Sequence, residues 1–241
     1  MNKTALITGA TGGIGSAIAQ KLLKTHTSLI LLGNKTQLNK RLFPSSKKPI
    51  HYAQVDLTDT KAVALFIQKN KKLFSTITTV IHAASPPIQF VSIEKVDTDE
   101  FIKHFTVAIP SLVQLIQASL ASLKSGSGRI IVITSSLTHN TPSAQLSPYV
   151  AAKTALSGLT KSLAVELAKY EITVNSISPG FTDTSYLDTL PSQLKQLVIP
   201  KIPLKRFAKP LEIATLVGYL CSKDAQYITG IDIPVAGGLV M

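Results

Sequence analysis

Short apolar segments alternate with longer helical patterns along the chain, and this alternation restricts the fold more than any other feature. The apolar segments carry hydrophobic residues at nearly every position, as in SLILL (28–32) and RIIVIT (129–134). A strand with one solvent-facing side would alternate polar and apolar residues, so these runs predict a parallel sheet buried on both faces. The strands are expected at Thr4–Thr8, Ser28–Leu32, Ile50–Val55, Thr78–His82, Arg129–Thr134, Ile172–Ser178 and Asp232–Val235.

Helical patterns occupy the intervals between these segments. They are expected at Gly13–Lys24, Thr60–Lys72, Asp99–Leu123, Ser147–Lys169 and Pro210–Cys221. A crossover between parallel strands is right-handed, so the helices must cover both faces of the sheet. The predicted fold is α/β, a doubly wound parallel sheet of the Rossmann type in a single domain over residues 1–241, with ligands at the carboxyl ends of the strands. Residues 182–209 lie outside the alternation and are predicted to form a flap over the substrate.

The composition narrows the function classes. Hydrophobic residues make up 45% of the 241 residues, and Lys and Arg outnumber Asp and Glu by 25 to 13. This positive charge attracts anions, but it is spread along the chain without an arginine-rich tract or recognition motif, so no nucleic-acid partner is expected.

The single cysteine, Cys221, excludes an intramolecular disulfide. No signal-peptide pattern and no apolar run near the roughly 20 residues of a membrane span are found, so a soluble, cytoplasmic protein without a membrane partner is expected.

The first strand leads into a glycine-rich turn, TALITGATGGIG (4–15). Gly9 can form the sharp turn, while Gly13 and Gly15 let a pyrophosphate approach the backbone and the helix pack on the sheet. The amino end of that helix offers free N–H groups and partial positive charge to phosphates. Alternatively, the turn is an ordinary strand-to-helix connection without a ligand. A dinucleotide is the preferred interpretation, with contacts expected at Gly9, Thr11, Gly12, Gly13, Ile14 and Gly15.

Tyr149 and Lys153 lie at positions i and i+4 of a predicted helix and therefore share one face. A neighbouring ammonium favours the phenolate and lowers the phenol pKa from about 10, which makes tyrosine a usable general acid near neutral pH. Ser136 follows a strand 13 residues upstream, where its hydroxyl and that of Tyr149 can bond one substrate oxygen. The alternative is an exposed helix pair without a catalytic role. No metal site is predicted.

Four segments in this order resemble those of the short-chain dehydrogenase/reductase family: T-G-x-x-x-G-x-G at Thr8–Gly15, the serine Ser136, Y-x-x-x-K at Tyr149–Lys153 and P-G-x-x-x-T at Pro179–Thr184. The glycines alone also satisfy the G-x-x-G-x-x-G of larger sugar-nucleotide epimerases. The resemblance covers essentially the whole chain. It is nearest to 3-oxoacyl-[acyl-carrier-protein] reductases, through YVAAKTALSGLTKSLAVELA, ITVNSISPGFTDT and YITGIDIPVAGG.

The resemblance implies a catalytic trio in which Ser136 positions a carbonyl, Tyr149 donates a proton, and Lys153 lowers the pKa of Tyr149 and holds the cofactor ribose. It further implies that Pro179, Gly180, Thr182 and Thr184 close over a nicotinamide, and that the protein is a homotetramer. The expected reaction is reduction of a 3-oxoacyl thioester, carried on acyl carrier protein or coenzyme A, as in fatty acid biosynthesis. The alternative is a nucleotide-binding sensor or scaffold of the same fold with little turnover.

The end of the second strand reads LLGNKTQ and carries no acidic residue to bind a ribose 2′-hydroxyl or repel a 2′-phosphate. Asn34 and Lys35 are therefore expected to contact the cofactor, and NADPH is predicted over NADH. The alternative is that Lys35 lies in solvent. Asp56, with Leu57 beside it, matches the family acid that contacts the adenine amino group, or else it caps a helix.

Two stretches depart from the family pattern. His82-Ala83-Ala84-Ser85 replaces N-N-A-G; Ala83 and Ala84 are still expected near the cofactor ribose, and His82 is interpreted as a hydrogen-bonded strand-end residue. Ala108 takes the place of an asparagine that holds a water for proton resupply. We hypothesise that a main-chain carbonyl freed by Pro110 holds this water instead, because proline cannot donate to the carbonyl four residues earlier. The rival inference is slow catalysis.

Overall fold

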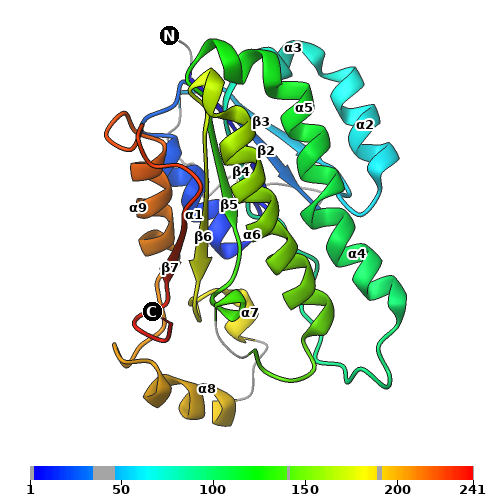
Figure 1. Ribbon diagram of the computed structural model, residues 1–241, viewed down its shortest axis with the longest axis vertical. Coiled ribbons are helices and arrows are strands. Elements are labelled where there is room, and N and C mark those ends of the chain that lie inside the picture. The colour runs from blue at the N-terminus through cyan, green and yellow to red at the C-terminus, as the bar shows by residue number, and fades with distance from the viewer. Residues whose placement is uncertain (1–2, 35–46, 140–141, 189–191, 241) are drawn as a thin grey trace.

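Seven parallel strands form one sheet in the computed structural model, which describes residues 3–34, 47–139, 142–188 and 192–240 (Figure 1). The strands are β1 (Thr4–Thr8), β2 (Ser28–Gly33), β3 (Ile50–Gln54), β4 (Ile77–His82), β5 (Arg129–Ile133), β6 (Thr173–Pro179) and β7 (Asp232–Val235). Their order is β3-β2-β1-β4-β5-β6-β7, so the winding reverses between β1 and β4. This reversal opens a crevice at the carboxyl ends of the strands. The predicted doubly wound α/β fold is confirmed.

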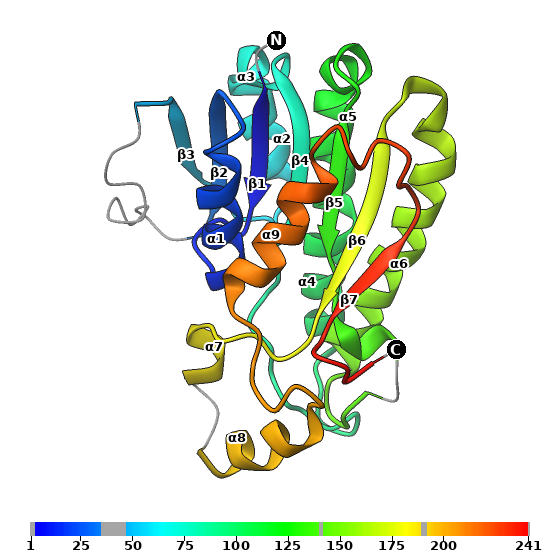
Figure 2. The same ribbon diagram turned by 90° about the vertical axis from the view of Figure 1, so that its left-hand side faces the viewer.

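Helices cover both faces of the sheet (Figure 2). One face carries α1 (Gly13–Leu22) and α9 (Pro210–Leu220), which pack against each other. The other carries α2 (Thr60–Lys69), α5 (Pro110–Ser125) and α6 (Ser147–Leu167), with α4 (Thr98–Ala108) packed against α6. Shorter helices are α3 (Lys71–Phe74), α7 (Ser185–Asp188) and α8 (Ser192–Val198), with single 3-10 turns at Ser136–Thr138, Ala168–Tyr170 and Ile199–Lys201.

The strands are buried on both sides because their side chains feed two separate cores. Leu6 of β1 and Val132 of β5 point into the core under α5 and α6. Ile7 and Ile131, their chain neighbours, point into the core under α1 and α9. Neighbouring strand residues face opposite sides, so a sheet with two covered faces requires the continuous apolar runs seen in the sequence.

Three predicted helices end one or two residues early, and two others differ more from the prediction. The helix expected at Asp99–Leu123 is two helices joined at Ile109, whose φ of −110° and ψ of −68° separate α4 from α5. Pro110 is the first residue of α5, a position where its missing N–H leaves no additional unpaired group. The helix expected at Thr60–Lys72 ends at Lys69, and Asn70 caps it by donating from Nδ2 to the Phe66 carbonyl at 2.8 Å.

The segment Thr98–Ser125 is long and apolar enough to cross a membrane when judged by length and composition alone, with a mean hydropathy of 1.5 over 18 residues. Half of this window is buried within the fold, as in a helix pair that covers a sheet.

Two buried histidines link neighbouring parts of the sheet. His26 Nε2 lies 3.0 Å from the Thr79 hydroxyl, and His82 Nδ1 lies 3.0 Å from the Thr8 hydroxyl. Burial, and then the charge of Lys3, lower the pKa of His26 to about 4. Burial, and then the charge of Lys153, lower the pKa of His82 to about 3. Both imidazoles are therefore neutral in the folded protein near pH 7.

These two histidines should make the fold acid-sensitive. The unfolded chain takes up protons on both as the pH falls below about 6.5, and the folded chain does not until about pH 4. Stability is therefore full above pH 6.5 and falls below it, by about 2 kcal/mol per histidine at pH 5. Urea unfolding at pH 7.5 and pH 5 measures this. His26→Gln should lose about half of the pH dependence; an unchanged pH dependence in that variant would contradict the account.

Candidate active site

The glycine turn brings β1, β4 and α1 into close contact. Gly9 has a φ of +67°, and a Cβ atom there would lie 2.7 Å from the Ala83 carbonyl oxygen. A Cβ on Gly15 would clash with the Gly9 carbonyl, and one on Gly13 would lie 2.5 Å from Thr184 Cγ2. Larger residues would therefore displace α1 from the turn. The glycines keep the amino end of α1 bare, which suits a phosphate.

A cleft of about 560 Å³ runs along this turn at the carboxyl ends of β1, β2 and β4. Most of the residues predicted to bind the adenosine and phosphate part of a cofactor line it: Gly9, Thr11, Gly12, Asn34, Asp56, Leu57, Ala83 and Ala84. At the end of β2, a Cβ on Gly33 would lie 3.0 Å from the Thr11 hydroxyl and 3.1 Å from the Tyr52 hydroxyl. Lys35 lies outside the described residues.

Asp56 does not cap the following helix. Its Oδ1 accepts from the Thr58 N–H at 2.9 Å and from the Thr58 hydroxyl at 2.7 Å. Asp59 is the cap of α2, since its carboxylate accepts from the Lys61 N–H at 2.8 Å. Asp56 thus shapes the turn that forms the cleft wall, and the helix-cap alternative is wrong.

An adjoining pocket of about 250 Å³ contains all three predicted catalytic residues. Ser136 enters it from the 3-10 turn after β5, and Tyr149 and Lys153 enter from the first turns of α6. Five further predicted cofactor contacts line the same pocket, namely Ile14, Pro179, Gly180, Thr182 and Thr184, and Ala83 lines both cavities. Gly13 and Gly15 line neither cavity. Segments far apart in the sequence therefore meet where a carbonyl and a nicotinamide would react.

Lys153 is the main source of charge in this pocket. Its ammonium donates to the Ile133 carbonyl at 2.7 Å and lies 5.8 Å from the centre of the Tyr149 ring. Burial lowers the pKa of Lys153 to about 8, so the side chain is still mainly a cation at pH 7. A cation in a dry pocket favours a negative charge on a neighbouring hydroxyl, which is what a tyrosine acid requires.

Comparisons with known proteins identify the family to which this chain belongs. A family model described as "Enoyl-(Acyl carrier protein) reductase" matches residues 9–240. The chain is 31% identical to "Dehydrogenase/reductase SDR family member 4" of Oryctolagus cuniculus, covering 98% of this chain and 93% of that protein. The chain belongs to the short-chain dehydrogenase/reductase family. It is an oxidoreductase of that family, with a nicotinamide cofactor.

Two further relatives of this oxidoreductase carry more specific names. The chain is 33% identical to 3-oxoacyl-[acyl-carrier-protein] reductase FabG of Rickettsia bellii, covering 99% of this chain and 97% of that protein. A solved structure titled YwfH, an NADPH-dependent reductase involved in bacilysin biosynthesis, superposes with a TM-score of 0.88 at 26% identity, covering 100% of this chain and 99% of that one. The resemblance to 3-oxoacyl reductases is thus confirmed.

His104 is a site residue that the sequence reasoning missed. It is buried on α4, and its ring stands edge-on to the Tyr149 ring with 6.1 Å between centroids. Burial lowers the pKa of His104, so it packs against Tyr149 mainly as a neutral ring. The only sequence feature that could have pointed to His104 is its position one helical turn before Ala108. That spacing is common in packed helices, so it does not identify a site residue.

His82 is the last residue of β4 and is hydrogen-bonded through Nδ1. The Thr8 hydroxyl accepts from the N–H groups of Ala83 and Ala84 at 3.2 Å, so its own proton is directed to His82 Nδ1. His82 therefore carries its proton on Nε2, which is buried and lies toward the Val107 backbone. The interpretation of His82 as a hydrogen-bonded strand-end residue is confirmed at Nδ1.

The surroundings of Ala108 bear on the hypothesis of a water held by a main-chain carbonyl. Ala108 is the last residue of α4 and is buried. The Val107 carbonyl already accepts from the Ser111 hydroxyl at 2.5 Å, and Pro110 has no N–H for the Thr106 carbonyl. The Thr106 carbonyl therefore lacks the i+4 N–H donor of a continuous helix, which is the condition that the hypothesis sets.

We expect Ala108→Asn to leave kcat within about threefold of the unmodified protein, because under this hypothesis a main-chain carbonyl takes over the task of the asparagine side chain. Steady-state kinetics with saturating cofactor measure this, and Ala108→Ser serves as a smaller polar control. A large increase in kcat specific to the asparagine variant would show that the chain lacks the water and is slow for that reason.

Lys153→Met should separate stability from activity. The pKa of Lys153 is lower in the folded state than the usual 10.4, so burying the ammonium costs about 3 kcal/mol at pH 7, and this cost disappears as the pH rises from 8 to 10. The methionine variant should be at least as stable at pH 7, with kcat lower by about a hundredfold or more. Urea unfolding at pH 7 and pH 9.5, beside turnover, measures both. A variant clearly less stable at pH 7 would contradict the account.

Proposed function

We propose that this chain is an NADPH-dependent reductase that converts a 3-oxoacyl thioester into the 3-hydroxyacyl thioester. One observation carries the proposal: Ser136, Tyr149 and Lys153 surround an apolar pocket, and that pocket adjoins the dinucleotide cleft. Ala83 and Ser85 line both cavities, so a substrate in one lies next to a cofactor in the other.

The side chains then have distinct tasks. The Ser136 hydroxyl orients the substrate carbonyl, and the Tyr149 hydroxyl gives its proton to the carbonyl oxygen as the carbon is reduced. Lys153 stabilises the phenolate that is left behind. The bound dinucleotide supplies the hydride. The glycine turn and the amino end of α1 hold the pyrophosphate.

The pocket walls favour an acyl substrate. They are formed mainly by large apolar side chains, namely Ile88, Phe90, Leu137, Leu146, Phe181 and Leu187. Lys153 is the one charged residue among the described residues that line it. Such a pocket suits an uncharged ketone with a short hydrocarbon chain. From the predicted flap, Leu187 lines this pocket, whereas Leu197 is exposed.

The choice of NADPH is supported by the neutral end of β2. Gly33 and Asn34 line the cleft there without a carboxylate, and the hydroxyl of Thr11, which also lines the cleft, can donate to a phosphate. The solved relative YwfH is itself named an NADPH-dependent reductase.

The nature of the acyl carrier is less directly supported. Lys124, a basic residue suited to docking an acidic carrier protein, is in the last turn of α5, and its ammonium lies 3.9 Å from the centre of the Tyr170 ring. This cluster is at the amino end of β5, whereas the pocket is at the carboxyl end. We therefore propose coenzyme A thioesters as substrates beside carrier-bound ones.

Homotetramer formation is also part of the proposal, supported by the exposed apolar side chains of Val165 and Tyr227.

The first test is NADPH oxidation with acetoacetyl-coenzyme A, compared with NADH and with a Tyr149→Phe control. We expect kcat/KM to be more than about tenfold higher with NADPH, and the phenylalanine variant to lose about a hundredfold or more in kcat because it has no proton to give. The same assay with acetoacetyl-acyl carrier protein ranks the two carriers.

Tight NADPH binding without turnover of any ketone would instead favour the second candidate, a nucleotide-binding sensor. Ala108, in the place of the family asparagine, is the observation on which that candidate depends.

A further inference from the structure

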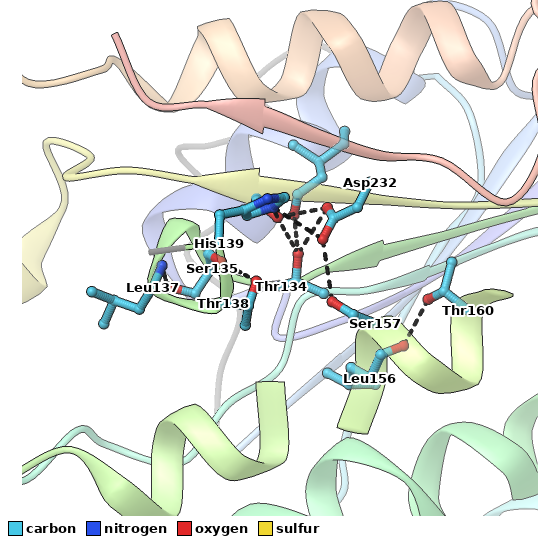
Figure 3. A network of polar contacts seen from close by, with 11 residues as sticks. Thr134, Ser135, Leu137, Thr138, His139, Leu156, Ser157, Thr160 and Asp232 are labelled. Carbon is cyan, nitrogen blue, oxygen red and sulfur yellow. Dashed lines mark hydrogen bonds and ion pairs between the residues drawn. The ribbon is translucent and has the colours of Figure 1, made fainter. Parts of the chain in front are cut away.

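We infer that Asp232 is a positioning residue, which holds the turn bearing Ser136 and the helix bearing Tyr149 and Lys153 in one fixed arrangement. For its effect on turnover, this inference rests on the reductase function proposed above. Asp232 is the first residue of β7 and lies outside both the cofactor cleft and the substrate pocket. Figure 3 shows Thr134, His139 and Ser157 directed toward its carboxylate.

The carboxylate of Asp232 has four donor groups close to it. Oδ1 accepts from the Ser178 hydroxyl at 2.6 Å and lies 3.3 Å from the Thr134 hydroxyl. Oδ2 accepts from the Ser157 hydroxyl at 3.2 Å and lies 3.3 Å from His139 Nε2. The Thr134 hydroxyl has a single proton and two nearer acceptors, the Ile177 carbonyl at 2.9 Å and the Ser178 hydroxyl at 2.8 Å, so the Ser178 and Ser157 hydroxyls are the main donors to Asp232. The side chain is only 11% exposed, so water competes little for these contacts.

Two of these donors flank the catalytic serine. Thr134 lies two residues before Ser136, and His139 lies three residues after it, at the end of the 3-10 turn Ser136–Thr138. His139 Nε2 also lies 3.0 Å from the Ser178 hydroxyl, whose proton is directed to Asp232. Both ends of the turn are therefore attached to one pair of side chains, and the Ser136 hydroxyl between them has little freedom to move.

The third donor comes from the helix that carries the other two catalytic residues. Ser157 lies one helical turn after Lys153, which lies one turn after Tyr149, so all three share a face of α6. The bond from Ser157 to Asp232 therefore fixes α6 relative to the Ser136 turn. Two hydroxyls on separate elements can address one substrate oxygen only when that relation is constant.

The contacts among Ser178, His139 and Asp232 do not form a hydrolytic triad. A triad histidine uses its two ring nitrogens for the two partners, whereas here Nε2 makes both contacts. Ser178 is fully buried and gives its proton to the aspartate, so it is not a nucleophile. The network is built to hold elements in place.

The test compares Asp232→Ala and Asp232→Asn with a control, Thr79→Val, which removes the buried bond to His26 farther from the pocket. Hydrogen exchange across residues 134–139 is the first readout, because it needs no substrate. We expect exchange there to become about tenfold faster in Asp232→Ala, and less so in Asp232→Asn, which keeps one acceptor oxygen. The control should leave exchange in this segment unchanged.

Kinetics provide the second readout. We expect Asp232→Ala to lower kcat by about ten- to a hundredfold while KM for NADPH stays within about twofold, since Asp232 does not line the cofactor cleft. Asp232→Asn should recover part of kcat, and Ser157→Ala, which removes only the link to α6, should have a smaller effect.

Unchanged exchange at residues 134–139 in Asp232→Ala would overturn the inference, as would full turnover in that variant. A parallel loss of kcat and NADPH affinity would also overturn it, because it would indicate general destabilisation. If the unmodified protein reduces no ketone, the proposed function fails, and hydrogen exchange alone then decides whether Asp232 holds the Ser136 turn.

Discussion

A lysine buried at the carboxyl edge of the sheet is the feature on which the rest of the site depends. An ammonium taken out of water is costly unless it donates hydrogen bonds. Lys153 finds one acceptor in the Ile133 carbonyl, the last residue of β5. The same carbonyl stands immediately before the chain that leads to Ser136, so the bond that makes the cation tolerable also places it beside the catalytic hydroxyls.

The sheet supplies this position because all of its strands end at the same edge. β1 leads into the glycine turn, β4 ends at His82 just before Ala83 contacts that turn, and β5 and β6 end at Ile133 and Pro179. The two hydrophobic cores on either side fix these ends relative to one another. The polar groups at the edge, including Asp232 and His139, then set finer positions that apolar packing alone does not determine.

Local patterns were sufficient to predict most of the fold and the members of the site. Continuous apolar strands, the glycine turn and the Tyr149–Lys153 spacing each have a short-range signature. The break at Ile109 was harder to place, because proline is tolerated both as a kink within a helix and as the first residue of the next. His104 and Asp232 could not be assigned, since their partners are far away in the sequence and only the folded chain brings them together. The roles of the individual site residues stay predictions.

The most direct test of this account is the titration of Lys153 itself. With lysine labelled at Cε with ¹³C, the resonance absent from Lys153→Met identifies this side chain, and its shift can be followed against pH by NMR. A buried cation with a single main-chain acceptor predicts a pKa of about 8. A resonance that titrates with the surface lysines near about 10.4 would show that the ammonium is solvated, and it would contradict the assignment of Lys153 as the buried charge that drives the site.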